Sequence, residues 1–225
     1  MTKPRVAAIV PMRHDSERVP GKNYRSFAGR PLYHRIVETL LACGAIDRVV
    51  IDSDSSPMLE EAARLFPSVT LLERPEHLRD GETPMNDVLL NTTAQVESEL
   101  YLQTHSTNPL LRADTLERAL TGFLDVYPTY DSLFGVTRLQ TRLWDPLARP
   151  INHNPAILLR TQDLPPVYEE NSCFYVFDRD TLLRRHNRIG DRPMLFEVPR
   201  NEAWDIDEEI DFDVAEFLFS RNPKG

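Results

Sequence analysis

The chain has 225 residues, of which 41% are apolar, so it can bury a core of its own and build one large α/β domain or two small ones. Its 26 basic and 35 acidic residues give a net charge of −9, which argues against binding a nucleic acid duplex or an anionic membrane, because both need a positive surface. The start of the chain is too charged for a signal peptide and no run of about 18 apolar residues occurs, which predicts a cytoplasmic location.

The predicted elements alternate between strand and helix. Residues 6–10, VAAIV, form a short apolar run that is typical of a strand buried on both faces, and residues 31–44 place their apolar side chains on one face of a helix. The alternation continues with strands predicted at residues 48–52, 69–73, 99–105 and 132–139, and with helices between them. This order predicts a single α/β domain with a mainly parallel sheet and helices on both faces.

Residues 141–171 interrupt the alternation. They are rich in proline and contain one short apolar run, which predicts an insertion without a continuous helix. A loop of about 30 residues in a compact domain usually has a function or pairs with a partner chain. We therefore expect packing against another subunit to order this insertion. Beyond it, residues 172–178 return to the sheet, residues 193–199 form another strand, and a helix follows.

A basic loop, residues 11–32, follows the first predicted strand. Ligands of parallel α/β sheets bind at the carboxyl ends of strands, so this loop is the first candidate site. Arg13 and Lys22 are suited to hold phosphate oxygens, and Ser16 and Asn23 add neutral hydrogen-bond donors. The loop matches neither a P-loop nor a dinucleotide-binding fingerprint. A solvated basic loop without a ligand is the alternative interpretation.

A second candidate is the segment WDIDEEIDF, residues 204–212. Asp205 and Asp207 alternate in a predicted extended segment, so their carboxylates lie on one face, where two hard oxygens can share a Mg²⁺ ion. In the alternative, Asp207 caps the following helix and Asp205 is solvated. Together with a phosphate-binding loop, the carboxylate pair favours a Mg²⁺ site for nucleoside triphosphate chemistry.

Five segments, in order, resemble motifs of the acylneuraminate cytidylyltransferase family, the group of CMP-sialic acid and CMP-KDO synthetases. PMRHDSERVPGKNYRSFAGRPL is similar to the family loop Ala-Arg-x-x-Ser-Lys-x-x-Pro-x-Lys-Asn. The other four are LERPEHLRD, LQTHSTNPLLR, NSCFYVFD and WDIDEEIDF. The similarity spans nearly the whole chain, and five motifs in the same order make it specific.

This resemblance implies one Rossmann-like nucleotidyltransferase domain over residues 1–225, with CTP as donor, Mg²⁺ as cofactor and a small acid as acceptor. It also implies a homodimer in which residues 141–171 reach the neighbouring subunit's site. An acceptor oxygen would attack the α-phosphate and pyrophosphate would leave, a reaction that needs mainly positioning and charge neutralisation.

The resemblance also implies roles for individual residues. Those expected to contact the nucleotide are Arg13, Ser16, Lys22, Asn23, Arg74 and Gln103, with the last two in the nucleotide or acceptor pocket. Those expected on the acceptor side are Arg160, Gln162, Glu169 and Asn171. Asp205 and Asp207 would hold the metal, and with Arg13 and Lys22 they form the expected catalytic set.

Two departures from the family pattern affect the expected substrate. Glu17 stands where the signature loop has a lysine, and Glu169 and Glu170 precede Asn171, where sialate-using members carry an arginine for the acceptor's carboxylate. A glutamate there would repel the acid, so we expect plain sialic acid to be a poor substrate unless Arg160 or Arg74 compensates. An acceptor with an amine or several hydroxyls on that side would be preferred.

Three alternatives to CMP transfer to a sugar acid stay open at this point. The first is CMP transfer to a different acid, such as a phosphonate. The second is a nucleotidyltransferase that acts on a sugar 1-phosphate, although the usual glycine-rich opening is absent. The third is a nucleotide-binding domain that has lost catalysis, which Glu17 and Glu169 would favour.

Overall fold

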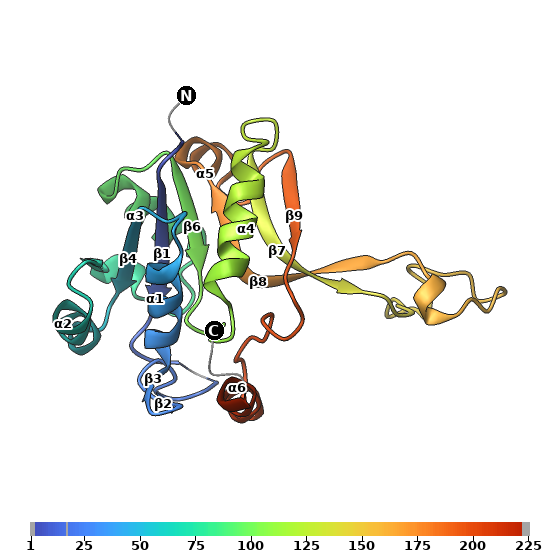
Figure 1. Cartoon of the computed structure of the whole chain (residues 1–225), viewed down its shortest axis with the longest axis horizontal. Helices are drawn as coiled ribbons and strands as arrows, with labels where there is room; N and C mark the ends of the chain where they lie inside the picture. Colours follow the sequence, from blue (N-terminus) through green and yellow to red (C-terminus); the bar gives the residue numbers. More distant parts are fainter. Residues whose placement is uncertain (1–2, 17, 222–225) are drawn as a thin grey trace.

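The computed structural model describes residues 3–16 and 18–221. One sheet contains seven strands in the order β5-β4-β1-β6-β8-β7-β9 (Figure 1). Their bounds are β1 (Val6–Met12), β4 (Arg48–Ser53), β5 (Thr70–Glu73), β6 (Leu100–Thr104), β7 (Ser132–Leu139), β8 (Val167–Phe177) and β9 (Pro193–Glu197). The short strands β2 (Ser26–Phe27) and β3 (Arg30–Pro31) pair separately as a small hairpin.

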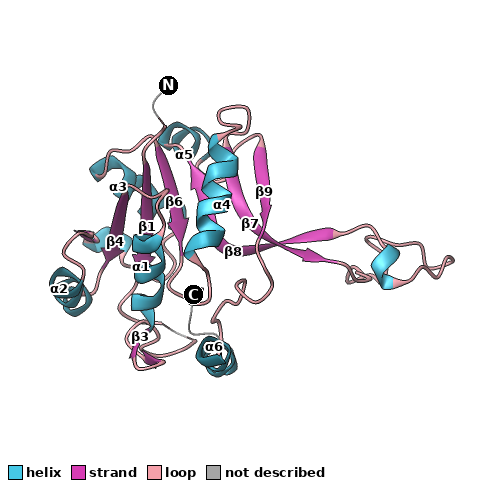
Figure 2. Ribbon diagram, viewed as in Figure 1, coloured by secondary structure: helices cyan, strands magenta, loops and turns pink. Residues whose placement is uncertain are grey.

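The helices lie on both faces of the sheet (Figure 2). Their bounds are α1 (Leu32–Ala42), α2 (Ser56–Leu65), α3 (Met85–Gln95), α4 (Ala113–Leu124), α5 (Arg179–Arg185) and α6 (Glu209–Arg221), with short 3-10 helices η1 (Glu76–Leu78) and η2 (Thr161–Asp163). Within the described ranges, no helix is both long and apolar enough to cross a membrane.

The sheet is mainly parallel, as the alternation of elements predicts. Strand β1 pairs in parallel with β4 and β6, β4 pairs in parallel with β5, and β7 pairs in parallel with β9. Strand β8 runs antiparallel to both of its neighbours, β6 and β7. The fold is Rossmann-like, which confirms the predicted fold class.

The apolar run of β1 contributes to the core on both faces of the sheet. Val6, Ala8 and Val10 belong to the cluster that includes side chains of α1, α2 and α4, whereas Ala7 and Ile9 belong to the cluster that includes side chains of α3 and α5. Successive side chains of a strand point to opposite faces, so a strand covered on both sides is apolar throughout. This burial fixes the carboxyl end of β1, where the basic loop begins.

Strands β7 and β8 continue beyond the sheet as a two-stranded ribbon that carries an extended arm (Figure 1). The ribbon pairs Val136 with Glu170 and Leu139 with Val167, and a register shift separates it from the pairing inside the sheet. Residues 140–166 form the tip of the arm, and their only helix is the short η2. The absence of a continuous helix from the insertion is as expected.

The strand predicted at residues 172–178 begins earlier than expected. Strand β8 starts at Val167, and residues 167–171 of the insertion form its part in the ribbon. Both faces of the ribbon are largely open to solvent there, so Tyr168, Glu169 and Glu170 are exposed and show no apolar alternation. A strand that buries neither face lacks the pattern by which strands are recognised.

Candidate active site

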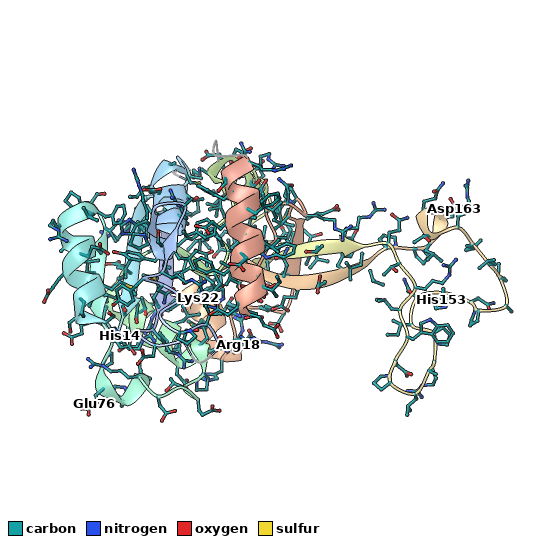
Figure 3. All side chains as sticks on the ribbon, turned by 90° about the horizontal axis from the view of Figure 1, so that it is seen from below. His14, Arg18, Lys22, Glu76, His153 and Asp163 are labelled. Carbon is teal, nitrogen blue, oxygen red and sulfur yellow. The ribbon has the colours of Figure 1, made fainter. Side chains whose placement is uncertain are left out.

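A pocket of about 530 Å³ lies at the carboxyl ends of the parallel strands. The residues that line it come from four segments: the end of β1 and the loop after it (Pro11, Met12, Arg13, His14, Asp15, Ser16, Arg18, Lys22, Asn23), the turn after β4 (Asp54), the segment after β5 (Arg79, Gly81, Glu82) and the turn after β6 (His105, Ser106, Thr107). Figure 3 shows His14, Arg18 and Lys22 close together at this edge. The structure therefore brings Arg13, Ser16, Lys22 and Asn23 to one pocket.

Local hydrogen bonds fix the shape of the basic loop. The amide of Lys22 donates to the carbonyl of Val19 (3.1 Å), and Gly21 has a positive φ of 63°, which other residues adopt only with strain. Asn23 connects two walls of the pocket, because its Nδ2 donates to the carbonyl of Arg13 (2.9 Å) and its Oδ1 accepts from Ser106 (2.6 Å). Asn23 thus holds the loop in place as well as lining the pocket.

Lys22 joins the basic loop to the segment that contains Asp205 and Asp207. Its side chain is buried, and its Nζ donates to the carbonyl of Ile206 at 2.5 Å. Burial lowers the pKa of Lys22, while the nearby carboxylates of Asp205 and Asp207 act in the opposite direction. The ammonium group of Lys22 therefore lies between the basic loop and the carboxylate pair, where it could bind the oxygens of a polyphosphate.

The two aspartates differ in environment. Oδ1 of Asp205 is buried and accepts no hydrogen bond within the described part of the chain. Burial raises the pKa of Asp205 and the charge of Asp207 adds to this shift, whereas the hydroxyl of Thr107 acts in the opposite direction. Asp207 is half exposed and its Oδ1 lies 2.7 Å from Nη2 of Arg18. Arg18, the partner of Asp207, lines the pocket. Thr107 also lines the pocket, and its carbonyl accepts from the amide of Ile206 (3.0 Å), the residue between the two aspartates. Both carboxylates therefore lie at the border of the pocket.

The alternative role for Asp207, a cap for α6, is not what the structure shows. Asp211, in the first turn of the helix, accepts from the amides of Asp207 (3.1 Å) and Glu208 (2.8 Å). An acidic side chain in the first turn also interacts favourably with the helix dipole. Asp211 therefore orders the start of α6 and leaves the carboxylate of Asp207 for the pocket side.

The residues present fit a divalent cation that is shared with a substrate. In the described ranges, no group of three or more His, Cys, Asp or Glu side chains is arranged to hold a metal by itself. The unpartnered oxygen of Asp205 and the neighbouring carboxylate of Asp207 supply two hard ligands. Mg²⁺ is commonly bound by one or two carboxylates together with substrate phosphates and water, which matches this donor set.

A chain of side chains extends from the pocket into the adjacent sheet. Gln103 is buried, and its Nε2 lies 2.9 Å from Nε2 of His105, which lines the pocket. Oε1 of Gln103 accepts from Nη1 of Arg188 at 2.6 Å. Burial, with the positive charges of Arg188 and Lys22, lowers the pKa of His105 to about 3, so its ring is neutral at pH 7.

Because His105 is neutral in the folded protein, we expect the free energy of unfolding to fall on acidification. Between its ordinary pKa of 6.5 and the folded-state value of about 3, the unfolded chain binds a proton that the folded chain excludes, so the free energy of unfolding falls as pH falls. From pH 7 to pH 4, we expect the wild type to lose about 3 kcal/mol more than His105→Gln in urea denaturation. His77→Gln, at an exposed site, should retain the wild-type pH dependence. Equal losses in all three proteins would contradict the role of His105.

Arg74 is not brought into the pocket. Its guanidinium is buried and pairs with Asp52, with Nε 2.7 Å from Oδ1, and Oδ2 of Asp52 also accepts from Thr92 at 2.6 Å. Arg74 therefore ties the ends of β4 and β5 together. Arg79, which donates to the carbonyl of Arg74 (2.7 Å), lines the pocket instead. Glu17, the departure from the signature loop, lies outside the described residues.

The four predicted acceptor residues do not lie together in one chain. Arg160 is at the tip of the arm, where its Nε is 2.7 Å from Asp163, and Gln162 is exposed beside it. Figure 3 shows Asp163 far from Lys22 and the pocket. Glu169 is exposed on the ribbon, and Asn171, at the base of the ribbon, donates to Thr137 (3.2 Å).

Several residues at or beside the pocket have no predicted role in the sequence analysis, among them Asp54, Arg79, Glu82 and Arg188. Asp54 lies two residues after the strand predicted at residues 48–52, so the rule that singled out the basic loop applies to it as well. Arg79 and Glu82 follow the next strand, and Arg79 lies within the segment LERPEHLRD. No sequence signal marks Arg188, because its place is set by tertiary contacts alone.

The fold and the pocket define a nucleotide-binding protein of the nucleotidyltransferase type. A family model described as "Cytidylyltransferase" matches residues 7–214, so the chain belongs to the cytidylyltransferase family and is a CTP-dependent nucleotidyltransferase.

Named relatives agree with this assignment. A pseudaminic acid cytidylyltransferase of Campylobacter jejuni is 27% identical, covering 95% of this chain and 96% of the relative. An N-acylneuraminate cytidylyltransferase A of Danio rerio is 25% identical, covering 94% of this chain and 50% of the relative. A structure of CMP:2-keto-3-deoxy-manno-octonic acid synthetase complexed with CTP superposes with a TM-score of 0.70 at 16% identity, covering 96% and 99% of the two chains, and shows the same fold.

Proposed function

We propose that this protein transfers CMP from CTP to a sugar acid of the nonulosonic or 3-deoxy-octulosonic type and releases pyrophosphate. The observation that carries the proposal is the contact between Lys22 of the basic loop and the Asp205–Asp207 segment, which joins phosphate-binding and metal-binding groups at one pocket. The family and the relatives' names support a sugar acid as acceptor. We propose that the reaction takes place in the cytoplasm.

The proposed reaction is a displacement at the α-phosphorus of CTP. A hydroxyl oxygen of the acceptor forms a bond to this phosphorus, the bond to the β-phosphate breaks, and the hydroxyl proton is released. Arg13 and Lys22 bind and orient the phosphates. Asn23 holds the basic loop against the turn after β6 through its hydrogen bonds to Arg13 and Ser106. Asp205 and Asp207 would hold Mg²⁺, which neutralises charge on the phosphates when bound.

A pyrophosphate-release assay tests the proposal. The protein would be supplied with each of the four common nucleoside triphosphates, Mg²⁺ and a panel of acids that includes pseudaminate, N-acetylneuraminate and 3-deoxy-manno-octulosonate. We expect release with CTP only and only when an acid is present, with the CMP-linked acid as product. Release with another nucleotide, release with a sugar 1-phosphate in place of the acid, or no release with any acceptor would contradict the proposal.

The arm supports the further proposal that two copies of the chain form a dimer. Its tip has no core of its own and exposes large apolar side chains, namely Trp144, Leu147, Ile151, Ile157, Leu158 and Leu159. Leu158 is 89% exposed and Leu147 is 70% exposed, which is costly for an isolated monomer. In such a dimer Arg160 and Gln162 would be available to the partner's pocket.

We expect the wild type to sediment as a dimer at micromolar concentration. Leu158→Asp should shift the population toward monomer by at least tenfold in the dissociation constant, because a charge would be buried in the apolar contact. Leu183→Asp changes a half-exposed leucine on α5 in the same way and should leave the dimer intact. A fully active wild-type monomer at this concentration would contradict the proposal.

A further inference from the structure

Arg188 lies on a platform formed by two neighbouring strands. Gln103 of β6 and Tyr175 of β8 are partners across the antiparallel pair. Arg188, in the segment between α5 and β9, donates from Nη1 to Oε1 of Gln103 at 2.6 Å, and its guanidinium carbon lies 3.6 Å from the centre of the Tyr175 ring. A hydrogen bond and an aromatic face together fix the position and the plane of the guanidinium.

The charge of Arg188 has no partner within the described part of the chain. No described carboxylate lies within ion-pair distance of its nitrogens, whereas the neighbouring Arg184 and Arg185 both pair with Asp191. Its Nη2 and Nε make no hydrogen bond to a described residue, so two parallel donors remain. A half-buried guanidinium held rigidly with two unused donors is suited to bind a carboxylate in bidentate fashion.

The platform adjoins the nucleotide pocket through His105. Gln103 contacts both Arg188 and His105, and His105 lines the pocket. The effect of Arg188 on the pKa of His105 agrees with this proximity. The hydroxyl of Tyr175 donates to Glu170. A molecule beside the platform therefore meets a cation over the ring, a carboxylate at the hydroxyl, and the nucleotide pocket next to them.

Resting on the proposed function, we propose that Arg188 binds the carboxylate of the acceptor acid, with Gln103 and Tyr175 as its positioning residues. In a 2-keto sugar acid, the carboxylate is attached to the carbon that bears the attacking hydroxyl. Binding the carboxylate beside the pocket thus brings this hydroxyl toward the α-phosphate. Arg188 takes the place of the arginine that is missing at Glu169 and Glu170, whereas Arg74 is committed to Asp52.

The position of Glu170 explains how an acid is tolerated there. Its carboxylate accepts from the hydroxyl of Tyr175, whereas the guanidinium of Arg188 lies over the centre of the ring and contacts Gln103, so Glu170 and Arg188 form no ion pair within the described residues. Glu169, one residue earlier, points to the other face of the ribbon by the alternation of a strand. The acceptor's acid group would bind at Arg188, and its hydroxyl or amine substituents would be directed toward Glu170.

Steady-state kinetics of Arg188→Ala test the inference. The acid that the wild type uses best would be varied at saturating CTP, and CTP at saturating acid. We expect the KM for the acid to rise about 100-fold, as for loss of a hydrogen-bonded charge pair, and the KM for CTP to change less than about twofold. Arg188→Lys should be intermediate, because lysine keeps the charge without the fork. Arg184→Ala, an exposed arginine on α5, should match the wild type.

A carboxamide analogue of the same acid identifies the group that Arg188 binds. The wild type should prefer the acid over the amide in kcat/KM by about 100-fold, and Arg188→Ala should lose most of this preference. Melting temperatures of the variants separate binding from folding. An unchanged preference, an equal rise in both KM values, or a loss of thermal stability alone would overturn the inference. A wild type that releases no pyrophosphate with any acid would instead overturn the proposed function, and the inference with it.

Discussion

Asp205→Asn is expected to lower kcat by about 10³-fold or more while the protein stays folded. The change keeps the shape of the side chain and removes the charge that would hold Mg²⁺ at an oxygen that has no other described partner. Because its pKa is raised in the folded state, the ionised carboxylate costs stability above that pKa and the protonated form does not. The variant should therefore melt at the same temperature as the wild type, or higher, at pH 7.

Pyrophosphate release at several Mg²⁺ concentrations and thermal denaturation would measure these two effects. Glu208→Gln serves as the matched control, because Glu208 is an exposed acid in the same segment, and it should keep near-normal turnover. If Asp205→Asn retains near-normal activity that depends on Mg²⁺, the proposed metal site is wrong.

Lys22→Met should reduce kcat/KM for CTP by about 10²-fold or more. Methionine keeps the apolar stem of the buried side chain but removes the positive charge from between the basic loop and the carboxylates. Loss of one preorganised donor to a reacting group commonly has an effect of this size. Steady-state kinetics with CTP as the varied substrate would measure it.

Arg30→Ala is the control for Lys22. Arg30 belongs to the same basic loop, but it is exposed, pairs with Glu38 and does not line the pocket, so its loss should leave kcat/KM within about twofold of the wild type. Equal losses in both variants would mean that the overall charge of the loop matters and not the position of Lys22. If Lys22→Met lowered only the thermal stability and left kcat/KM unchanged, the role of Lys22 would be structural and the proposed contact with the phosphates would be wrong.

The sequence was informative where a residue's surroundings follow from its own strand. Val6 to Val10 form an unbroken apolar run because both faces of β1 are buried, so the strand and the loop after it were predictable. The rule that ligands meet the carboxyl ends of parallel strands then placed Arg13 and Lys22 at the pocket. The alternation of Asp205 and Asp207 similarly marked two neighbouring carboxylates.

The sequence was not informative where a position depends on contacts between distant segments. Lys22 reaches the carbonyl of Ile206, 184 residues later, and no local pattern encodes that contact. Arg74 belongs to a family-like motif, yet its pairing with Asp52 depends on the packing of β4 against β5. Arg188 likewise owes its place to Gln103 and Tyr175 on two other strands.

The ribbon formed by β7 and β8 limits how the arm can change in length during evolution. Adding one residue to each strand would move the tip outward by about 3.4 Å and would also turn it over, because the side chains of a strand alternate between faces. Adding two residues to each strand would extend the arm and preserve the direction of every side chain at the tip. Insertions and deletions that keep the tip's surface functional are therefore expected in steps of two residues per strand.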